Sequence, residues 1–127
     1  MNPLEKYRPH QFTLIFLHGL GDSSEEFLGN FYKHEGYGLT NRYTRIILPA
    51  APKRPVTCNE KQETHSWFDI FTNDQEIKAH SSLGEVYARF NQEEMNESAD
   101  VLLKIIEEEK EKLPDKDSKR LFIGGYS

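Results

Sequence analysis

The sequence predicts an α/β fold with a mostly parallel sheet and flanking helices. Three short apolar runs, at residues 12–17, 44–48 and 121–123, have the length of strands. The first run shows no alternation with a period of two, which is typical of a parallel strand covered on both faces. Helical patterns separate the runs. The order strand, helix, strand, long loop, helix, strand therefore favours a parallel sheet with right-handed crossovers.

The first strand and the first helix are joined by a glycine-containing turn at residues 19–22. Asp22 or Ser23 can cap a helix that begins near Ser24, because both side chains accept a hydrogen bond from a free backbone N–H. Two glycines, at positions 36 and 38, are expected to end that helix.

The second strand is followed by three prolines, Pro49, Pro52 and Pro55. They predict that regular structure stops there, because proline lacks the N–H that helices and sheets use. A long connection then extends from residue 53 to about residue 83. It carries enough apolar side chains to predict a segment that packs on the domain or lines a site.

A second helical pattern begins near Glu85 and ends before Pro114. The apolar residues expected on its buried face are Met95, Ala99, Leu102, Leu103 and Ile106. The acidic run at residues 107–111 is interpreted as a solvated face of the same helix. The third strand follows and leads into Gly124-Gly125-Tyr126-Ser127.

Composition excludes several classes of function. The chain has 127 residues, which predicts one domain, and its net charge of −5 with no basic stripe argues against a nucleic-acid partner. No apolar run is long enough to span a bilayer, and residues 1–11 have no signal-peptide centre. The only cysteine, Cys58, cannot form an internal disulfide. These features favour a soluble protein of the reduced cytoplasm.

Familiar cofactor and metal patterns are absent. Gly19-Leu20-Gly21 follows a strand, but a dinucleotide fingerprint needs a third glycine where Ser24 stands. The turn does offer backbone N–H groups that could stabilise an oxyanion. The five histidines have no metal-ligand spacing, so no metal and no cofactor is expected.

Ser127 is the sharpest candidate for catalysis. A serine directly after a strand and Gly-Gly-Tyr matches the first three positions of the G-x-S-x-G nucleophile elbow, in which a strand turns abruptly and exposes the serine hydroxyl. By itself this half-motif leaves a chance serine as an alternative. Trp67 and Phe68 fit a core or a pocket wall equally well.

Four segments in register resemble the acyl-protein thioesterase, lysophospholipase and carboxylesterase family. They are residues 16–22 (FLHGLGD), 49–57 (PAAPKRPVT), 66–70 (SWFDI) and 124–127 (GGYS). The resemblance covers residues 12–127 and only the front part of such a protein. It implies an α/β-hydrolase fold, of which residues 1–127 would be the N-terminal part of a single incomplete domain.

The resemblance also implies roles for individual residues. Ser127 would be the nucleophile, the backbone N–H of Leu20 an oxyanion donor, and Gly19, Gly21 and Trp67 parts of the substrate site. The family's catalytic Asp and His follow the serine in the sequence. Asp69, Asp74 and His65 precede it, so they are not assigned those roles. The implied substrates are acylated proteins, lysophospholipids or small esters, and the oligomeric state stays open.

Three hypotheses follow. The chain is part of a serine esterase or thioesterase, an inactive truncated fragment, or a short acyl-binding module without catalysis. Glutamine commonly follows the serine in the resembled family, so one hypothesis is that codon 128 is a UAA or UAG that the organism reads as glutamine. The alternatives are an exon boundary, a sequencing error and a pseudogene. The coding sequence downstream tests this hypothesis.

Overall fold

The computed structural model describes residues 10–33, 43–72 and 82–127, and the structural statements below concern those residues. A parallel sheet contains β1 (Phe12–Leu17), β2 (Thr44–Ile47) and β5 (Leu121–Gly125). Their order is β2-β1-β5, so β1 lies in the middle. The three predicted strands are confirmed. The expected helix end at residues 36–38 lies outside the described residues, as does Asp74.

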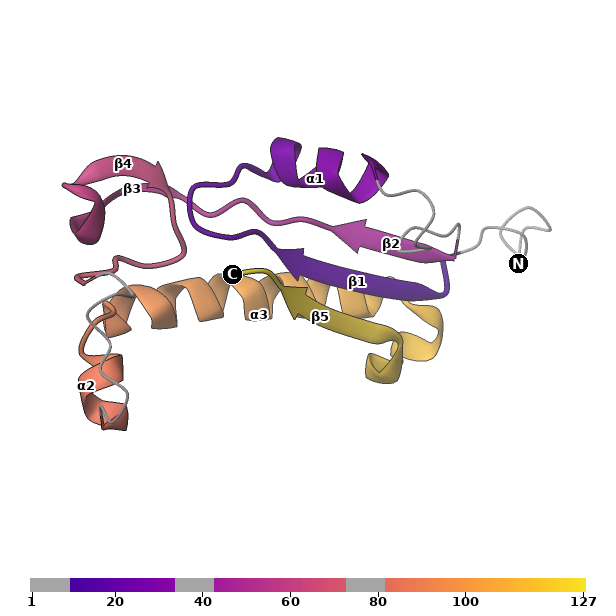
Figure 1. Cartoon of the computed structure of the whole chain (residues 1–127). Coiled ribbons are helices and arrows are strands. Elements are labelled where there is room, and N and C mark those ends of the chain that lie inside the picture. The colour runs from indigo at the N-terminus through magenta and orange to yellow at the C-terminus, as the bar shows by residue number, and fades with distance from the viewer. Residues whose placement is uncertain (1–9, 34–42, 73–81) are drawn as a thin grey trace.

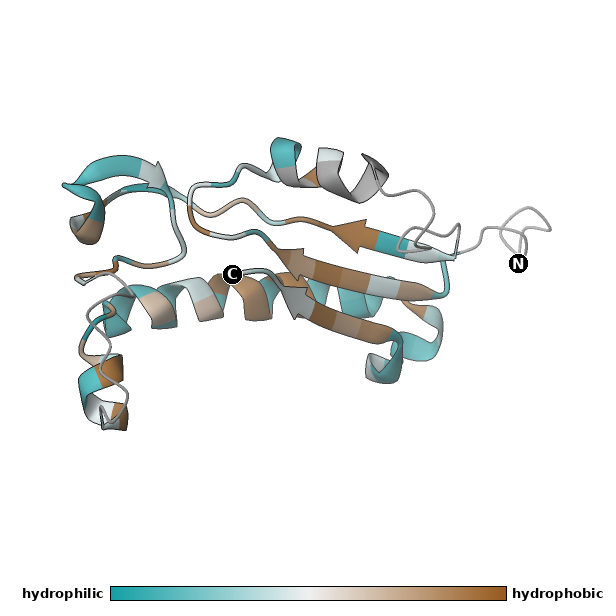
Figure 2. Cartoon of the chain, viewed as in Figure 1, coloured by the Kyte–Doolittle hydropathy of each residue, from teal (hydrophilic) through white to brown (hydrophobic). Residues whose placement is uncertain are grey.

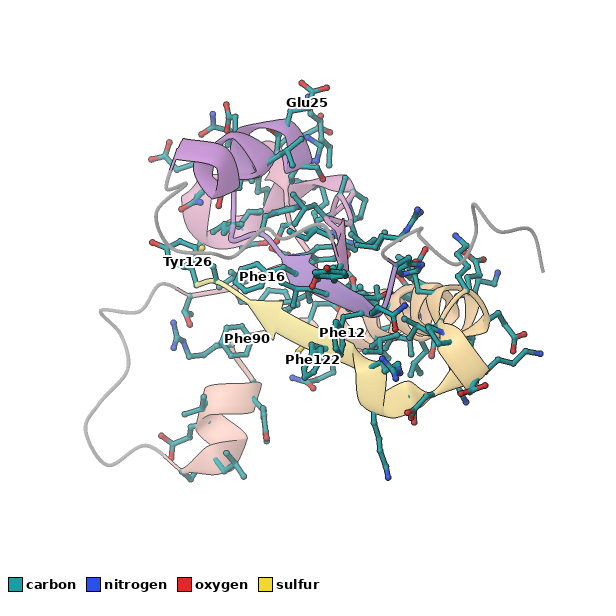
Figure 3. The ribbon with its side chains drawn as sticks, turned by 90° about the vertical axis from the view of Figure 1, so that its right-hand side faces the viewer. Phe12, Phe16, Glu25, Phe90, Phe122 and Tyr126 are labelled. Atoms are coloured by element: carbon teal, nitrogen blue, oxygen red, sulfur yellow. The ribbon has the colours of Figure 1, made fainter. Side chains whose placement is uncertain are left out.

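Two helices cover opposite faces of this sheet. Figure 1 shows α1 (Ser24–Lys33) above the sheet and α3 (Gln92–Glu111) below it, and the turned view in Figure 3 agrees. The chain moves from β1 to β2 on one side and later returns to the other side of β1 as β5. Two right-handed crossovers that move in opposite directions along a sheet place their helices on opposite faces. The positions of α1 and α3 follow this rule.

A polar side chain caps the start of each long helix, and of these two caps the sequence predicted the one on α1. Ser23 Oγ accepts a hydrogen bond from the N–H of Glu26 at 3.1 Å and caps α1. Asn91 Oδ1 accepts one from the N–H of Glu94 at 3.1 Å and caps α3. The second helical pattern was expected to be one helix from Glu85, but the structure divides it into the short helix α2 (Leu83–Tyr87), a turn, and α3.

The buried stripe of α3 differs from the expected one. Its buried residues are Ser98 and Glu109, and the half-buried ones beside them are Met95, Leu102, Ile105 and Ile106, of which Met95, Leu102 and Ile106 were expected there. Leu103 is 58% exposed, and Ala99 is also exposed, so the prediction was wrong for both residues. A polar residue, Ser98, occupies the stripe because its hydroxyl donates to the carbonyl oxygen of Trp67.

Glu109 corrects the interpretation of the acidic run as a solvated face. Its side chain is buried, and its two carboxylate oxygens lie 3.1 Å from Arg45 Nε and 3.0 Å from Lys112 Nζ. Glu107, Glu108 and Glu111 are exposed, as expected. Arg45 belongs to β2, so this ion pair ties the helix to the sheet.

The proline-rich connection contains regular structure, contrary to prediction. β3 (Lys53–Val56) and β4 (Gln62–His65) form an antiparallel hairpin. Pro55 pairs with Glu63 inside it. A two-stranded ribbon tolerates proline because each strand has a free edge toward which the position without an N–H can face. Val56 is fully buried and anchors the hairpin.

Hydrophobic residues, brown in Figure 2, occur on all three strands of the parallel sheet. Ile15 of β1 is fully buried, but Phe122 and Ile123 of β5 are more than half exposed. β5 lies at an edge of the sheet, with Phe122 beside Phe12 (Figure 3) and their ring centroids 6.4 Å apart. Among the described residues, no helix is both long and apolar enough to cross a membrane.

Candidate active site

The candidate site lies at the carboxyl ends of two neighbouring strands, the central strand β1 and the strand β5. Leu17 of β1 pairs with Gly125 of β5, and the N–H of Tyr126 donates to the carbonyl oxygen of Leu17 at 3.1 Å. The connections from β1 and into β5 run over opposite faces of the sheet. In open parallel sheets, such a reversal leaves a crevice at the carboxyl ends of the strands, where ligands commonly bind.

Ser127 lies at this edge, one residue (Tyr126) beyond the end of β5, and is exposed. Its φ is 65°, in the left-handed region that side-chain-bearing residues seldom adopt. A strained backbone of this kind is typical of functional positions, where surrounding structure enforces it. A positive φ at the serine is compatible with the sharp turn of a nucleophile elbow. The elbow and the catalytic role of Ser127 stay predictions.

Glycines allow the two strand ends to approach each other closely. A Cβ built on Gly19 would lie 3.0 Å from Ser127 Cβ and 3.1 Å from the carbonyl oxygen of Tyr126. One built on Gly124 would lie 2.7 Å from the ring of Phe16, which is the neighbouring residue of β1. Side chains at either position would push the serine-bearing segment away from β1.

The turn at residues 19–22 leaves one backbone donor unused. The N–H of Gly19 donates to Asp22 Oδ2 at 3.2 Å, that of Asp22 to the carbonyl oxygen of Gly19 at 3.2 Å, and that of Gly21 to the carbonyl oxygen of His65 at 3.0 Å. Gly21 has a φ of 81°, which glycine adopts readily. No described residue accepts from the N–H of Leu20. The residue expected to supply an oxyanion donor thus has a donor available.

His18 holds this turn in place, a role that the sequence reasoning missed. The residue is only 2% exposed. Nδ1 lies 2.8 Å from the carbonyl oxygen of Gly19, and Nε2 lies 3.0 Å from the backbone nitrogen of Ala51. Periodicity gives no signal for such a histidine, since its partners are backbone atoms from two separate turns.

Trp67 packs against the ring of His18. Their rings are stacked with centroids 5.1 Å apart, and Trp67 Nε1 donates to the carbonyl oxygen of His18 at 3.0 Å. Trp67 also lines a pocket of about 160 Å³ between the loop after β2 and helix α3. The other lining residues are Ala50, Pro52, Arg54, Glu97, Ser98 and Val101. Trp67 is thus both a packing residue and a pocket wall, the two alternatives that the sequence left open.

Asp69 and His65, which were not assigned to the catalytic site, have structural partners. Asp69 accepts from the N–H of Thr57 at 2.8 Å and from its hydroxyl at 2.6 Å. His65 Nδ1 lies 2.7 Å from the carbonyl oxygen of Ala51. Within the described part of the chain, no three His, Cys, Asp or Glu residues gather as a metal site would require.

Comparison with known proteins agrees with this arrangement. Residues 4–127 match the phospholipase/carboxylesterase family. Acyl-protein thioesterase 1 homolog 1 of Dictyostelium discoideum is 35% identical, over 93% of this chain and 46% of its own length. Acyl-protein thioesterase 1 of Yarrowia lipolytica is 34% identical over the same shares of the two chains.

A solved structure extends the comparison to three dimensions. The crystal structure of Arabidopsis thaliana SOBER1 superposes with a TM-score of 0.69 and 25% identity, covering 92% of this chain and 50% of that one. The chain spans about half the length of the relatives that it matches. Its parallel sheet and helices correspond to the N-terminal half of that α/β-hydrolase fold. The chain therefore belongs to the phospholipase/carboxylesterase family.

Proposed function

We propose that the protein is a serine hydrolase that cleaves carboxylic esters or thioesters through an acyl-serine intermediate. The observation that carries the proposal is Ser127, held at a φ of 65° against Gly19 where β1 and β5 end. That geometry exposes a serine hydroxyl beside a turn with an unused backbone donor, which are two parts of an acyl-transfer site.

In the proposed reaction, Ser127 Oγ attacks the carbonyl carbon of the substrate while a general base takes its proton. The negative charge that develops on the carbonyl oxygen is stabilised by the N–H of Leu20. The alcohol or thiol leaves with a proton from the protonated base, and water then releases the acid by the same steps. The chemistry needs no metal and no cofactor.

The base and its orienting carboxylate would come from residues after Ser127, in the order serine, aspartate, histidine that α/β-hydrolases share. His18 is not a candidate, because both its ring nitrogens already face backbone partners. His65 and Asp69 likewise hold loops. We therefore propose that catalysis belongs to a longer protein, here termed the complete enzyme, that contains this chain.

The substrate class rests on the relatives. Those from Dictyostelium and Yarrowia are named acyl-protein thioesterases, which supports a thioester of an acylated protein as substrate. Lysophospholipids and small esters present the same reacting carbonyl and are the other substrates of the proposal.

A second candidate is an inactive or purely acyl-binding protein. A rice relative, 36% identical over 72 residues, is named a probable inactive carboxylesterase. This reading predicts that no form of the protein hydrolyses an ester. A polypeptide of residues 1–127 is expected to be inactive under both readings, because the part of it that the structure describes holds no base positioned for Ser127. The complete enzyme distinguishes them.

The test is serine-directed labelling of the complete enzyme with a fluorophosphonate probe, together with hydrolysis of an acyl thioester and of a p-nitrophenyl ester. Ser127→Ala should abolish labelling and hydrolysis. Ser118→Ala, an exposed serine in the turn before β5, is the matched control and should keep both. Activity that survives Ser127→Ala contradicts the assignment of the nucleophile, and a complete enzyme that neither labels nor hydrolyses supports the second candidate.

A further inference from the structure

We propose that His18 is a positioning residue that fixes the orientation of the Leu20 N–H as an oxyanion donor. The inference rests on the proposed function and adds a residue to it. His18 neither touches the substrate nor transfers a proton. It acts through the peptide group that joins Gly19 to Leu20.

The argument begins with peptide geometry. The carbonyl oxygen of Gly19 and the N–H of Leu20 belong to one planar peptide group, and in a trans peptide they point in opposite directions. The described chain contains no cis peptide bond. Whatever holds the carbonyl of Gly19 therefore also sets the direction of the Leu20 N–H, which is the N–H that no described residue binds.

Two donors hold that carbonyl. His18 Nδ1 lies 2.8 Å from it and the backbone nitrogen of Asp22 lies 3.2 Å from it. Because the Leu20 N–H points away from both, it is directed away from the His18 ring. A preorganised donor of this kind stabilises a developing charge without having to reorient during the reaction.

The ring of His18 is itself fixed, and in one tautomer. A carbonyl oxygen can only accept, so Nδ1 carries the proton. Ala51 N–H can only donate, so Nε2 must offer its lone pair. The carbonyl of Ala51 is in turn held by His65 Nδ1 at 2.7 Å, and Trp67 stacks on the His18 ring. The turn at residues 19–22 is thereby tied to the loop after β2 through one buried imidazole.

Two substitutions separate this role from simple packing. Asparagine places an amide N–H near the position of Nδ1, so His18→Asn keeps a donor to Gly19 and loses the acceptor for Ala51. Glutamine places its amide oxygen near Nε2, so His18→Gln keeps the acceptor for Ala51 and loses the donor to Gly19. Each variant loses one buried hydrogen bond, and we expect similar losses of thermal stability.

Their kinetics are expected to differ. In the complete enzyme, His18→Gln should lower kcat for a thioester by about tenfold or more with little change in KM, since loss of an oxyanion donor costs roughly a hundredfold. His18→Asn should stay within a few-fold of the wild-type kcat. In a Leu20→Pro background, which has no N–H to orient, His18→Gln should cause no further loss. Equal kcat values for the Asn and Gln variants, or additive losses in the double variant, would overturn the inference.

Failure of this inference is distinguishable from failure of the proposed function. Activity that does not depend on Ser127 would refute the proposed function. Ser127-dependent activity with equal kcat values for the two His18 variants would refute only the positioning role of His18. If the variants do not fold, the inference can still be tested on the unsubstituted enzyme. Long-range ¹⁵N–¹H correlation spectra of the histidine rings report which ring nitrogen carries the proton. His18 should show a protonated Nδ1 and an unprotonated Nε2, and the opposite tautomer would refute the proposal.

Discussion

Gly19 and Ser127 lie in contact across the ends of two neighbouring strands, so that a Cβ on Gly19 would stand 3.0 Å from the Cβ of the serine. Gly19→Ala must shift Ser127 or the Tyr126 carbonyl, 3.1 Å from the same point. We expect kcat of the complete enzyme to fall on the order of tenfold, because small displacements of a nucleophile are costly.

The control for this substitution is Gly29→Ala. Gly29 lies inside α1, and a Cβ there would meet no atom within 4 Å. Alanine should leave kcat unchanged and raise the free energy of unfolding by up to about 1 kcal/mol, since glycine is a poor helix former. Equal kcat values for the two variants would contradict the close approach of Gly19 and Ser127.

Leu20 is expected to act through its backbone. Leu20→Pro removes the N–H and should lower kcat by about a hundredfold. Leu20→Ala keeps the N–H and removes a side chain that is 40% exposed, so its loss should be far smaller. Steady-state kinetics of both variants with one thioester provide the test. Small and equal effects would remove Leu20 from the site.

Residues 1–127 produced by themselves should associate. Phe122 and Ile123 are exposed on β5, the edge of the described sheet, and an exposed apolar edge strand pairs readily with other chains. Sedimentation velocity should show concentration-dependent association, and Phe122→Lys should reduce it. Tyr87→Lys, at an exposed residue of α2, is the control and should not. A monomer that melts cooperatively at all concentrations would refute this prediction.

Glu109 should stabilise the complete enzyme, unlike its neighbour Glu108. Both cations beside Glu109 are about half exposed, so the loss should be smaller than for a fully buried pair. We expect Glu109→Ala to lower the free energy of unfolding by about 1–2 kcal/mol. Glu108→Ala should change it by less than about 0.5 kcal/mol. Urea unfolding measures both, and identical midpoints would show that the burial of Glu109 has no energetic effect.

The sequence predicted the three strands of the parallel sheet, the cap of α1 and the position of Ser127 after the last strand because each depends on neighbours in the chain. An apolar run, a serine before a helix and a serine after Gly-Gly-Tyr are all local signals. The hairpin of β3 and β4 was missed because Pro55 was weighed without the partner strand, whose free edge makes it tolerable.

Long-range partners explain the other errors. Glu109 is buried because Arg45 of β2 lies opposite it, and no pattern within an acidic run could reveal that. His18 contacts Ala51, 33 residues later in the sequence, and Trp67, 49 residues later. The local sequence shows only that His18 precedes a glycine and gives no indication of these distant contacts.

The central place of β1 has a consequence for synthesis. β1 is made early, but it pairs on one side with β5, and the contact between Gln11 and Arg120 beside that pair joins residues 109 positions apart. At translation rates of about 5–20 residues per second, the interval is roughly 5–20 s. During that time the apolar residues of β1 have one open flank, which a holding chaperone could shield on the ribosome. The turn that follows β1 acquires its neighbour Ser127 only when the last residues of this segment emerge.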